Sequence, residues 1–214
     1  ALIATTEQGL QWLYKQAAQW GATPLFEPTF DWKDPLLLRP TSKKLNDRRD
    51  AAFIELDSVE ALEVLCRCAS VQVTFSVNPN DAVAILNRLW AAKLHTNDYP
   101  NDVYWRRYIA LSRAKYNTER YAGPESFASL EDYASYIARQ PIHMYNGQRC
   151  NPPLSIGVLG NAPNALALAL RNVWNHYRLK RFGDTLAIEA RPFARRHDQK
   201  IATTVQQIKS IVQP

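Results

Sequence analysis

The alternation over residues 70–77 is the feature that most constrains the fold of this chain. Apolar residues occupy the odd positions from Val71 to Val77, and uncharged polar residues occupy the even positions from Ser70 to Ser76. Successive strand residues point to opposite faces of a sheet, so the pattern predicts a strand, within residues 64–77, that has one apolar and one polar face. The polar face is either exposed to solvent or lines a wet cavity, because exposed strands more often carry Lys, Glu or Arg.

Five other segments have patterns typical of helices, and the alternation of apolar and polar residues recurs over residues 185–191, which predicts a second strand. Asn78 is expected to cap the second helix, and the last helix is expected to begin near His197 or Asp198. Together these elements predict an α+β fold, with a mainly antiparallel sheet and helices packed on one side. No repeat or Gly/Ser-rich linker divides the chain, which predicts a single domain over residues 1–214. The helices are expected over residues 5–20, 78–90, 129–140, 162–178 and 197–212.

Composition narrows the class of protein. The chain has 214 residues, of which 46% are hydrophobic, and no uncharged run of about 18 apolar residues is present, so a soluble globular protein without membrane contact is expected. Its net charge of +6 favours anionic partners. Three cysteines without zinc-site spacing indicate structural thiols in a reducing cytoplasm. The start at Ala1 and the single methionine, Met144, suggest that a preceding segment is missing.

Glu189 and Arg191 lie two residues apart on a predicted strand and therefore project from one face, about 7 Å apart along the backbone. The simplest interpretation is a surface salt bridge. The alternative is a magnesium ligand beside a phosphate clamp, because hard cations take oxygen ligands and a guanidinium matches phosphate oxygens. A basic run before this strand and the polar face around Gln72 favour the alternative. Basic residues are frequent over the whole stretch 171–196, which includes this strand: Arg171, Arg178, Lys180, Arg181, Arg191, Arg195 and Arg196.

The segment from Tyr104 to Tyr121 alternates aromatic and cationic side chains. Such a pattern can bind single-stranded nucleic acid by stacking and phosphate contact. It also fits an ordinary amphipathic segment, or arginines that hold a substrate carboxylate. Nucleic-acid binding is the less favoured interpretation. The four histidines lack metal-ligand spacing, so each is interpreted as structural or exposed.

Several short motifs follow one another between residues 5 and 212. They include a strand that reads Cys-Arg-Cys-Ala-Ser-Val-Gln-Val-Thr-Phe, a helix with Phe127, Tyr133 and Tyr136, and a final Glu-x-Arg. Their order and spacing resemble the plant and proteobacterial type of glutamate–cysteine ligase, a carboxylate–amine ligase of glutamine-synthetase-like fold. The motifs that carry this resemblance lie at residues 66–75, 96–107, 118–123, 127–136, 177–181 and 188–191.

The resemblance implies a reaction and a set of site residues. In that family ATP phosphorylates the γ-carboxylate of glutamate with the help of magnesium, and the cysteine amine then attacks the acyl phosphate. ATP and Mg are therefore the implied cofactors. By position, the resemblance implies Glu189 as the metal ligand, Arg191 and Arg181 as catalytic residues, Gln72 and Thr74 at the nucleotide, and Arg106, Arg107 and Arg120 at the substrate carboxylate or phosphate.

The expected function is thus an ATP-dependent carboxylate–amine ligase of the kind that serves glutathione biosynthesis. Its expected partners are a glutamate-like dicarboxylate, an amino-acid amine and ATP. The sequence leaves the choice between a monomer and a homo-oligomer open. The resemblance makes this chain the C-terminal two-thirds of the ligase domain and places most magnesium-ligating glutamates before Ala1, so activity is expected only with that segment present. The alternative is a degenerate, non-catalytic relative that binds nucleotide or amino acid as a partner subunit.

Overall fold

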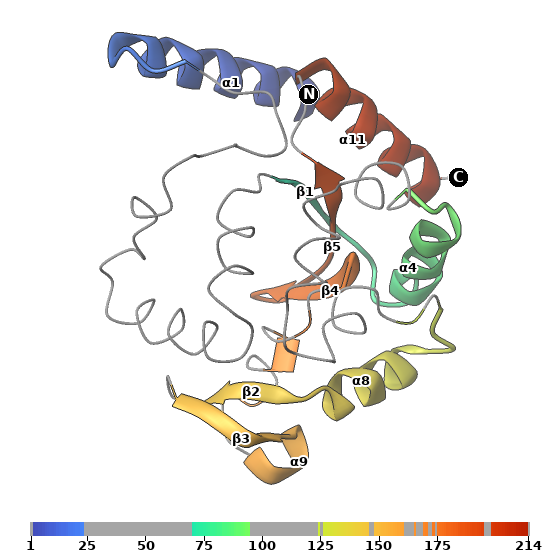
Figure 1. Cartoon of the computed structure of the whole chain (residues 1–214). Coiled ribbons are helices and arrows are strands. Elements are labelled where there is room, and N and C mark those ends of the chain that lie inside the picture. The colour runs from blue at the N-terminus through green and yellow to red at the C-terminus, as the bar shows by residue number, and fades with distance from the viewer. Residues whose placement is uncertain are drawn as a thin grey trace.

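In the computed structural model, the described part of the chain forms ten helices and strands. Figure 1 shows their arrangement. The described residues are 2–23, 70–94, 124, 126–145, 148–160, 165, 169–170, 173, 175–194 and 198–213. The elements are α1 (Leu2–Gln19), β1 (Ser70–Ser76), α4 (Ala82–Ala91), α8 (Leu130–Arg139), β2 (Ile142–Tyr145), β3 (Gln148–Leu154), α9 (Ile156–Leu159), β4 (Tyr177–Phe182), β5 (Thr185–Ala194) and α11 (Asp198–Val212).

Three strands form an antiparallel sheet in the order β1-β5-β4, and β2 and β3 form a separate antiparallel pair. The predicted strand alternation of residues 70–77 is confirmed by β1, which pairs with β5 over its length. Strands β4 and β5 are joined by a two-residue turn in which Gly183 takes a positive φ of 57°. Glycine adopts that backbone conformation without the steric cost that a Cβ would add.

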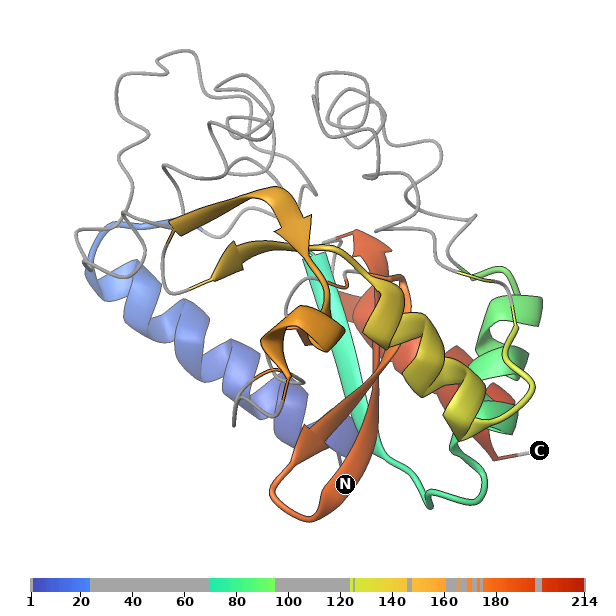
Figure 2. The same ribbon diagram turned by 90° about the horizontal axis from the view of Figure 1, so that it is seen from below.

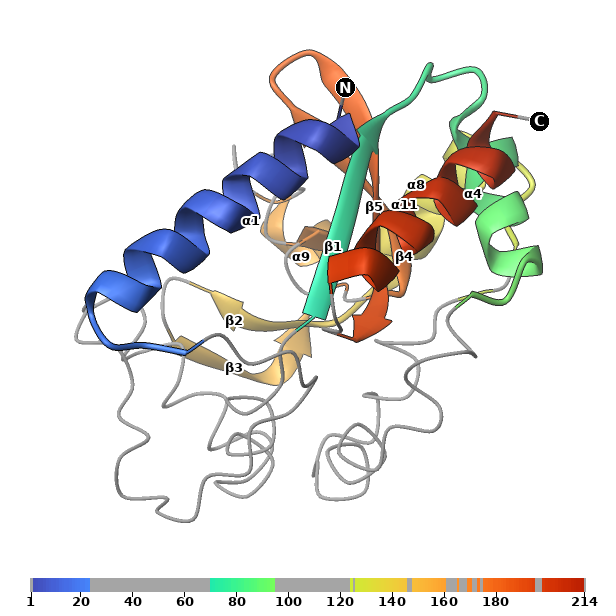
Figure 3. The same ribbon diagram turned by 90° about the horizontal axis from the view of Figure 1, so that it is seen from above.

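The apolar face of the sheet packs on the core. Helix α4 contacts β4 and β5, and α11 contacts α4 in turn. Figures 2 and 3 show α4, α8 and α11 on one side of the sheet and α1 on the other. The α+β class and the antiparallel sheet are thus confirmed, whereas α1 departs from the expectation that helices lie on one side only. The largest fully buried apolar side chains of the core are Leu86, Leu89, Ile137, Ile142, Val173, Tyr177 and Ile188.

Helix boundaries agree with the sequence at some ends and differ at others. Gly21 follows α1 in a left-handed conformation, with a φ of 68°, and the Ser129 side chain caps α8 by accepting from the Asp132 backbone N–H. The prediction that Asn78 caps α4 is wrong, because Asp81 occupies the N-cap position. The Asn78 side chain instead accepts from the Asn80 backbone N–H at 3.0 Å and closes a turn ahead of the helix.

The predicted helix over residues 162–178 is wrong at its C-terminal end. Residues 165, 169 and 170 are helical, but Val173 and Asn175 are not, and β4 begins at Tyr177. From Tyr177 onward the chain alternates between buried and partly exposed side chains, which is the period of a strand. In the described part of the chain no helix has both the length and the apolar character needed to cross a bilayer.

Candidate functional site

The second face of the three-stranded sheet is polar and charged. Thr74 of β1 pairs with Glu189 of β5, which pairs in turn with Arg178 of β4, so their side chains leave the same face in one row. The apolar residues beside them, such as Val73 and Ala190, face the core on the opposite side. We call this face the polar sheet face. Its polar and charged described residues are Gln72, Thr74, Ser76, Arg178, Lys180, Glu189 and Arg191.

Glu189 is the centre of the polar sheet face. Only 3% of the residue is exposed, and three cations surround its carboxylate. Arg178 Nε donates to Oε2 at 2.7 Å, the Lys180 ammonium donates to Oε1, and Arg191 Nε lies 3.7 Å from Oε2. A buried charge is tolerated when it is paired and hydrogen-bonded, and each oxygen of Glu189 has such a partner. We call these four residues the Glu189 cluster.

Arg178 is fixed by backbone as well as by the carboxylate. Its Nη1 donates to the Val173 carbonyl at 2.6 Å and to the Leu170 carbonyl at 3.3 Å. The guanidinium presents its donors in a rigid planar fork, so bonds to different acceptors fix its orientation. These two hydrogen bonds connect the segment before β4 to the polar sheet face.

The electrostatic balance favours the charged form of Glu189. Burial raises the pKa of this carboxyl, but the Lys180 hydrogen bond and the charges of Arg178 and Arg191 outweigh it and hold the pKa below the ordinary value. Glu189 is therefore an anion at neutral pH. Within the Glu189 cluster, three cations surround one carboxylate.

The structure brings together four of the eight residues singled out from the sequence. Glu189, Arg191, Gln72 and Thr74 lie on the polar sheet face, with Gln72 and Thr74 exposed. Arg181 leaves β4 on the other face from Arg178 and Lys180, and its guanidinium bonds to the Gly183 carbonyl and to Asp184 in the exposed turn. The remaining residues, Arg106, Arg107 and Arg120, lie outside the described residues.

Two site residues were not assigned a role from the sequence. The sequence places Arg178 and Lys180 in the basic stretch and in the motif at residues 177–181 but assigns them no role, because residues up to 178 are predicted to form a helix. The signal that identifies them is the strand alternation of residues 177–180, in which Tyr177 and Leu179 are buried and the two cations share the opposite face.

A magnesium ion held by Glu189 does not fit this arrangement. At an effective dielectric constant of about 20, a divalent ion about 4 Å from a cation is repelled by about 8 kcal/mol, and three such repulsions exceed the attraction of about 11 kcal/mol from one carboxylate at about 3 Å. Magnesium sites need several oxygen ligands. Within the described ranges, no group of three or more His, Cys, Asp or Glu side chains is placed to hold a metal ion.

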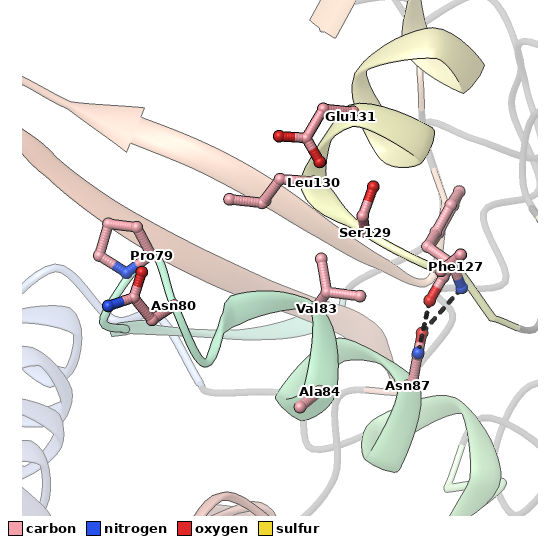
Figure 4. A pocket seen from close by; sticks show the side chains of 10 residues that line it. Pro79, Asn80, Val83, Ala84, Asn87, Phe127, Ser129, Leu130 and Glu131 are labelled. Carbon is pink, nitrogen blue, oxygen red and sulfur yellow. Dashed lines mark hydrogen bonds between the residues drawn. The ribbon is translucent and has the colours of Figure 1, made fainter.

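A separate pocket lies between α4 and α8, with a volume of about 420 Å³ (Figure 4). The Asn87 carboxamide holds its two sides together, because it donates to the Phe127 carbonyl at 2.8 Å and accepts from the Phe127 N–H at 3.0 Å. Glu131 is the one charged side chain of its lining, so the pocket is unsuited to anions. The lining residues are Pro79, Asn80, Val83, Ala84, Asn87, Phe127, Ala128, Ser129, Leu130 and Glu131.

The polar sheet face therefore presents three cations, whereas the lining of the pocket between α4 and α8 has none. Comparisons of the chain with protein-family models, with curated proteins and with solved structures find no match.

Proposed function

We propose that the polar sheet face binds an anionic ligand, a phosphate or carboxylate group of a small molecule. The observation that carries this proposal is the Glu189 cluster, in which Arg178, Lys180 and Arg191 surround a single carboxylate. Charge-assisted hydrogen bonds from guanidinium and ammonium groups are the strong means of holding such anions. The exposed hydroxyl and carboxamide groups of Thr74 and Gln72, on the neighbouring strand, add uncharged hydrogen-bonding groups to the same face.

The ligands to test are ATP and glutamate, which carry the two anionic groups that the resemblance to carboxylate–amine ligases suggests. Calorimetry with the full chain measures both affinities. Lys180→Gln removes one charge from a side chain that is 31% exposed, so the strand is expected to fold and the affinity to fall by about tenfold. The matched control is Lys209→Gln, which removes the same charge from the exposed surface of α11. Equal affinities in the two variants would show that the polar sheet face is not the binding site.

A catalytic form of this proposal is an ATP-dependent carboxylate–amine ligase resembling glutamate–cysteine ligase. A specific feature supports it: the Glu-x-Arg strand and the strand of Gln72 are neighbours, with Thr74 opposite Glu189. Phosphoryl transfer relies mostly on positioned cations around the transferred group, and Arg191 is such a cation. In this form of the proposal, magnesium is bound by the nucleotide phosphates and not by Glu189. The cytoplasm, which supplies ATP, is the proposed location.

The catalytic form is tested by release of ADP in the presence of glutamate, an amino-acid amine and magnesium, using the protein with any preceding segment that its gene encodes. We expect Arg191→Gln to lower the rate at least tenfold, whereas Glu7→Gln, an exposed change on α1, leaves it unchanged. Binding of ATP or glutamate without any ADP release would establish the non-catalytic alternative, a binding or partner subunit.

A further inference from the structure

The oxygens of Glu189 are directed at cations of the protein itself. Oε2 accepts from Arg178 and lies near Arg191, and Oε1 accepts from Lys180. A carboxylate that ligates a divalent ion must offer an oxygen lone pair to that ion, usually beside other anionic ligands. Among the described residues, the charged side chains beside Glu189 are all positive. Glu189 therefore has the environment of a counter-ion.

Exposure differs between the carboxylate and the cations. The Glu189 side chain is 4% exposed, whereas those of Arg178, Arg191 and Lys180 are 13%, 19% and 31% exposed. A ligand that approaches from solvent thus meets cations before it meets the carboxylate. Three cationic side chains match the three acceptor oxygens and the double negative charge of a phosphoryl group better than the two oxygens of a carboxylate.

We propose that Glu189 is the internal counter-ion of Arg178, Lys180 and Arg191, and that these cations bind a phosphoryl dianion without a divalent metal at Glu189. This inference rests on the proposed anion-binding function and narrows it to phosphate and to a metal-free site. In the ligand-free protein Glu189 partly neutralises the three cations, and the incoming phosphoryl oxygens take over part of that pairing. Glu189 and the ligand consequently compete for the same donors.

The first experiment measures binding of inorganic phosphate, ATP and acetate to the full chain by calorimetry, once with excess EDTA and once with excess magnesium. We expect inorganic phosphate to bind with the same affinity in both buffers, within about twofold, and acetate to bind at least tenfold more weakly. ATP binding without detectable phosphate binding would show that the nucleoside is required and would overturn the metal-free phosphate site. Phosphate binding that appears only with magnesium would overturn the inference but keep the proposed function, whereas no binding of any probe would refute the proposed function itself.

The second experiment uses opposite charge changes in the Glu189 cluster. Glu189→Gln removes the competing carboxylate, so phosphate affinity in EDTA is expected to rise about threefold to tenfold. Lys180→Gln removes a donor, so the phosphate affinity is expected to fall about tenfold, which corresponds to about 1.4 kcal/mol. A merely structural role for both residues would weaken binding in both variants, and that result would overturn the inference.

Two controls keep the second experiment decisive. Lys209→Gln, on the exposed surface of α11, is expected to leave phosphate affinity unchanged. Circular dichroism of each variant identifies any that does not fold. The comparison of EDTA and magnesium on the unaltered protein needs no variant, so it decides the inference even if Glu189→Gln does not fold.

Discussion

Tyr133 links α8 to the edge of the three-stranded sheet. Its side chain is buried, at 4% exposure, and its hydroxyl oxygen accepts a hydrogen bond from the Leu179 backbone N–H at 3.0 Å. Strand β4 is an edge of the sheet, so this N–H is not paired with another strand of the described chain. Tyr133→Phe leaves a buried donor without its acceptor. We expect the free energy of unfolding to fall by about 1–3 kcal/mol at neutral pH.

The same substitution has a pH signature. Burial, the largest effect, raises the pKa of Tyr133 to about 12, and the Leu179 N–H and the charge of Arg178 oppose it. An unfolded tyrosine has a pKa of about 10, so at about pH 11 it is mostly ionised in the unfolded state and mostly neutral in the folded state. The unfolded state then binds fewer protons, and stability falls as pH rises, by about 1.4 kcal/mol from pH 8 to 11. Tyr133→Phe lacks this loss.

The assay is urea denaturation of both proteins at about pH 8 and about pH 11. The advantage of the unaltered protein over Tyr133→Phe is expected to shrink by about 1.4 kcal/mol between the two pH values. Ile137→Val is the control, because it removes a buried methyl group from the same helix, should cost about 0.5–1.5 kcal/mol and introduces no ionisable group. A difference for Tyr133→Phe that stays as constant with pH as that of the control would refute the reasoning.

Three further outcomes follow from other contacts. Asn87→Ala removes both hydrogen bonds to the Phe127 backbone and is expected to lower the free energy of unfolding by about 1–3 kcal/mol in urea denaturation. Glu189 has a lowered pKa, so its stabilisation is present above about pH 4.3 and is lost as pH falls through its folded pKa; the advantage of the unaltered protein over Glu189→Gln should narrow in acid denaturation. Asp184→Asn is expected to leave the denaturation midpoint unchanged, because its pair with Arg181 is exposed.

Local patterns predicted the elements whose two faces differ most in polarity. The alternation of Val71, Val73 and Phe75 with Gln72 and Thr74 predicted β1 from the sequence, and the structure pairs it with β5. Strand alternation depends only on neighbouring residues and on a core that covers one face, so it can be recognised without knowing the partner strand. The final helix was also predicted correctly, and α11 begins at Asp198.

The start of β4 was not predicted, because its residues follow an apolar run that favours a helix. Residues 165–170 read Ala-Leu-Ala-Leu-Ala-Leu, and helix propensity carries no information on where a partner strand ends the helix. The antiparallel pairing of β4 with β5 gives the backbone its partners, and it places Arg178 and Lys180 on one face and Arg181 on the other. The choice between these cations follows from register, which is a long-range property of the sheet.

Stability alone does not account for the Glu189 cluster. Buried ion pairs lose in desolvation much of what they gain in attraction, and a cluster of three cations around one carboxylate also contains repulsion between its cations. The opposite face of the same strands already supplies apolar burial through residues such as Ile188 and Leu179. A phosphoryl dianion would offset the repulsion between these cations and bind only the folded state, so it would raise the free energy of unfolding with its concentration. Relief of the repulsion among the cations of the ligand-free protein thus contributes to the affinity for the anion.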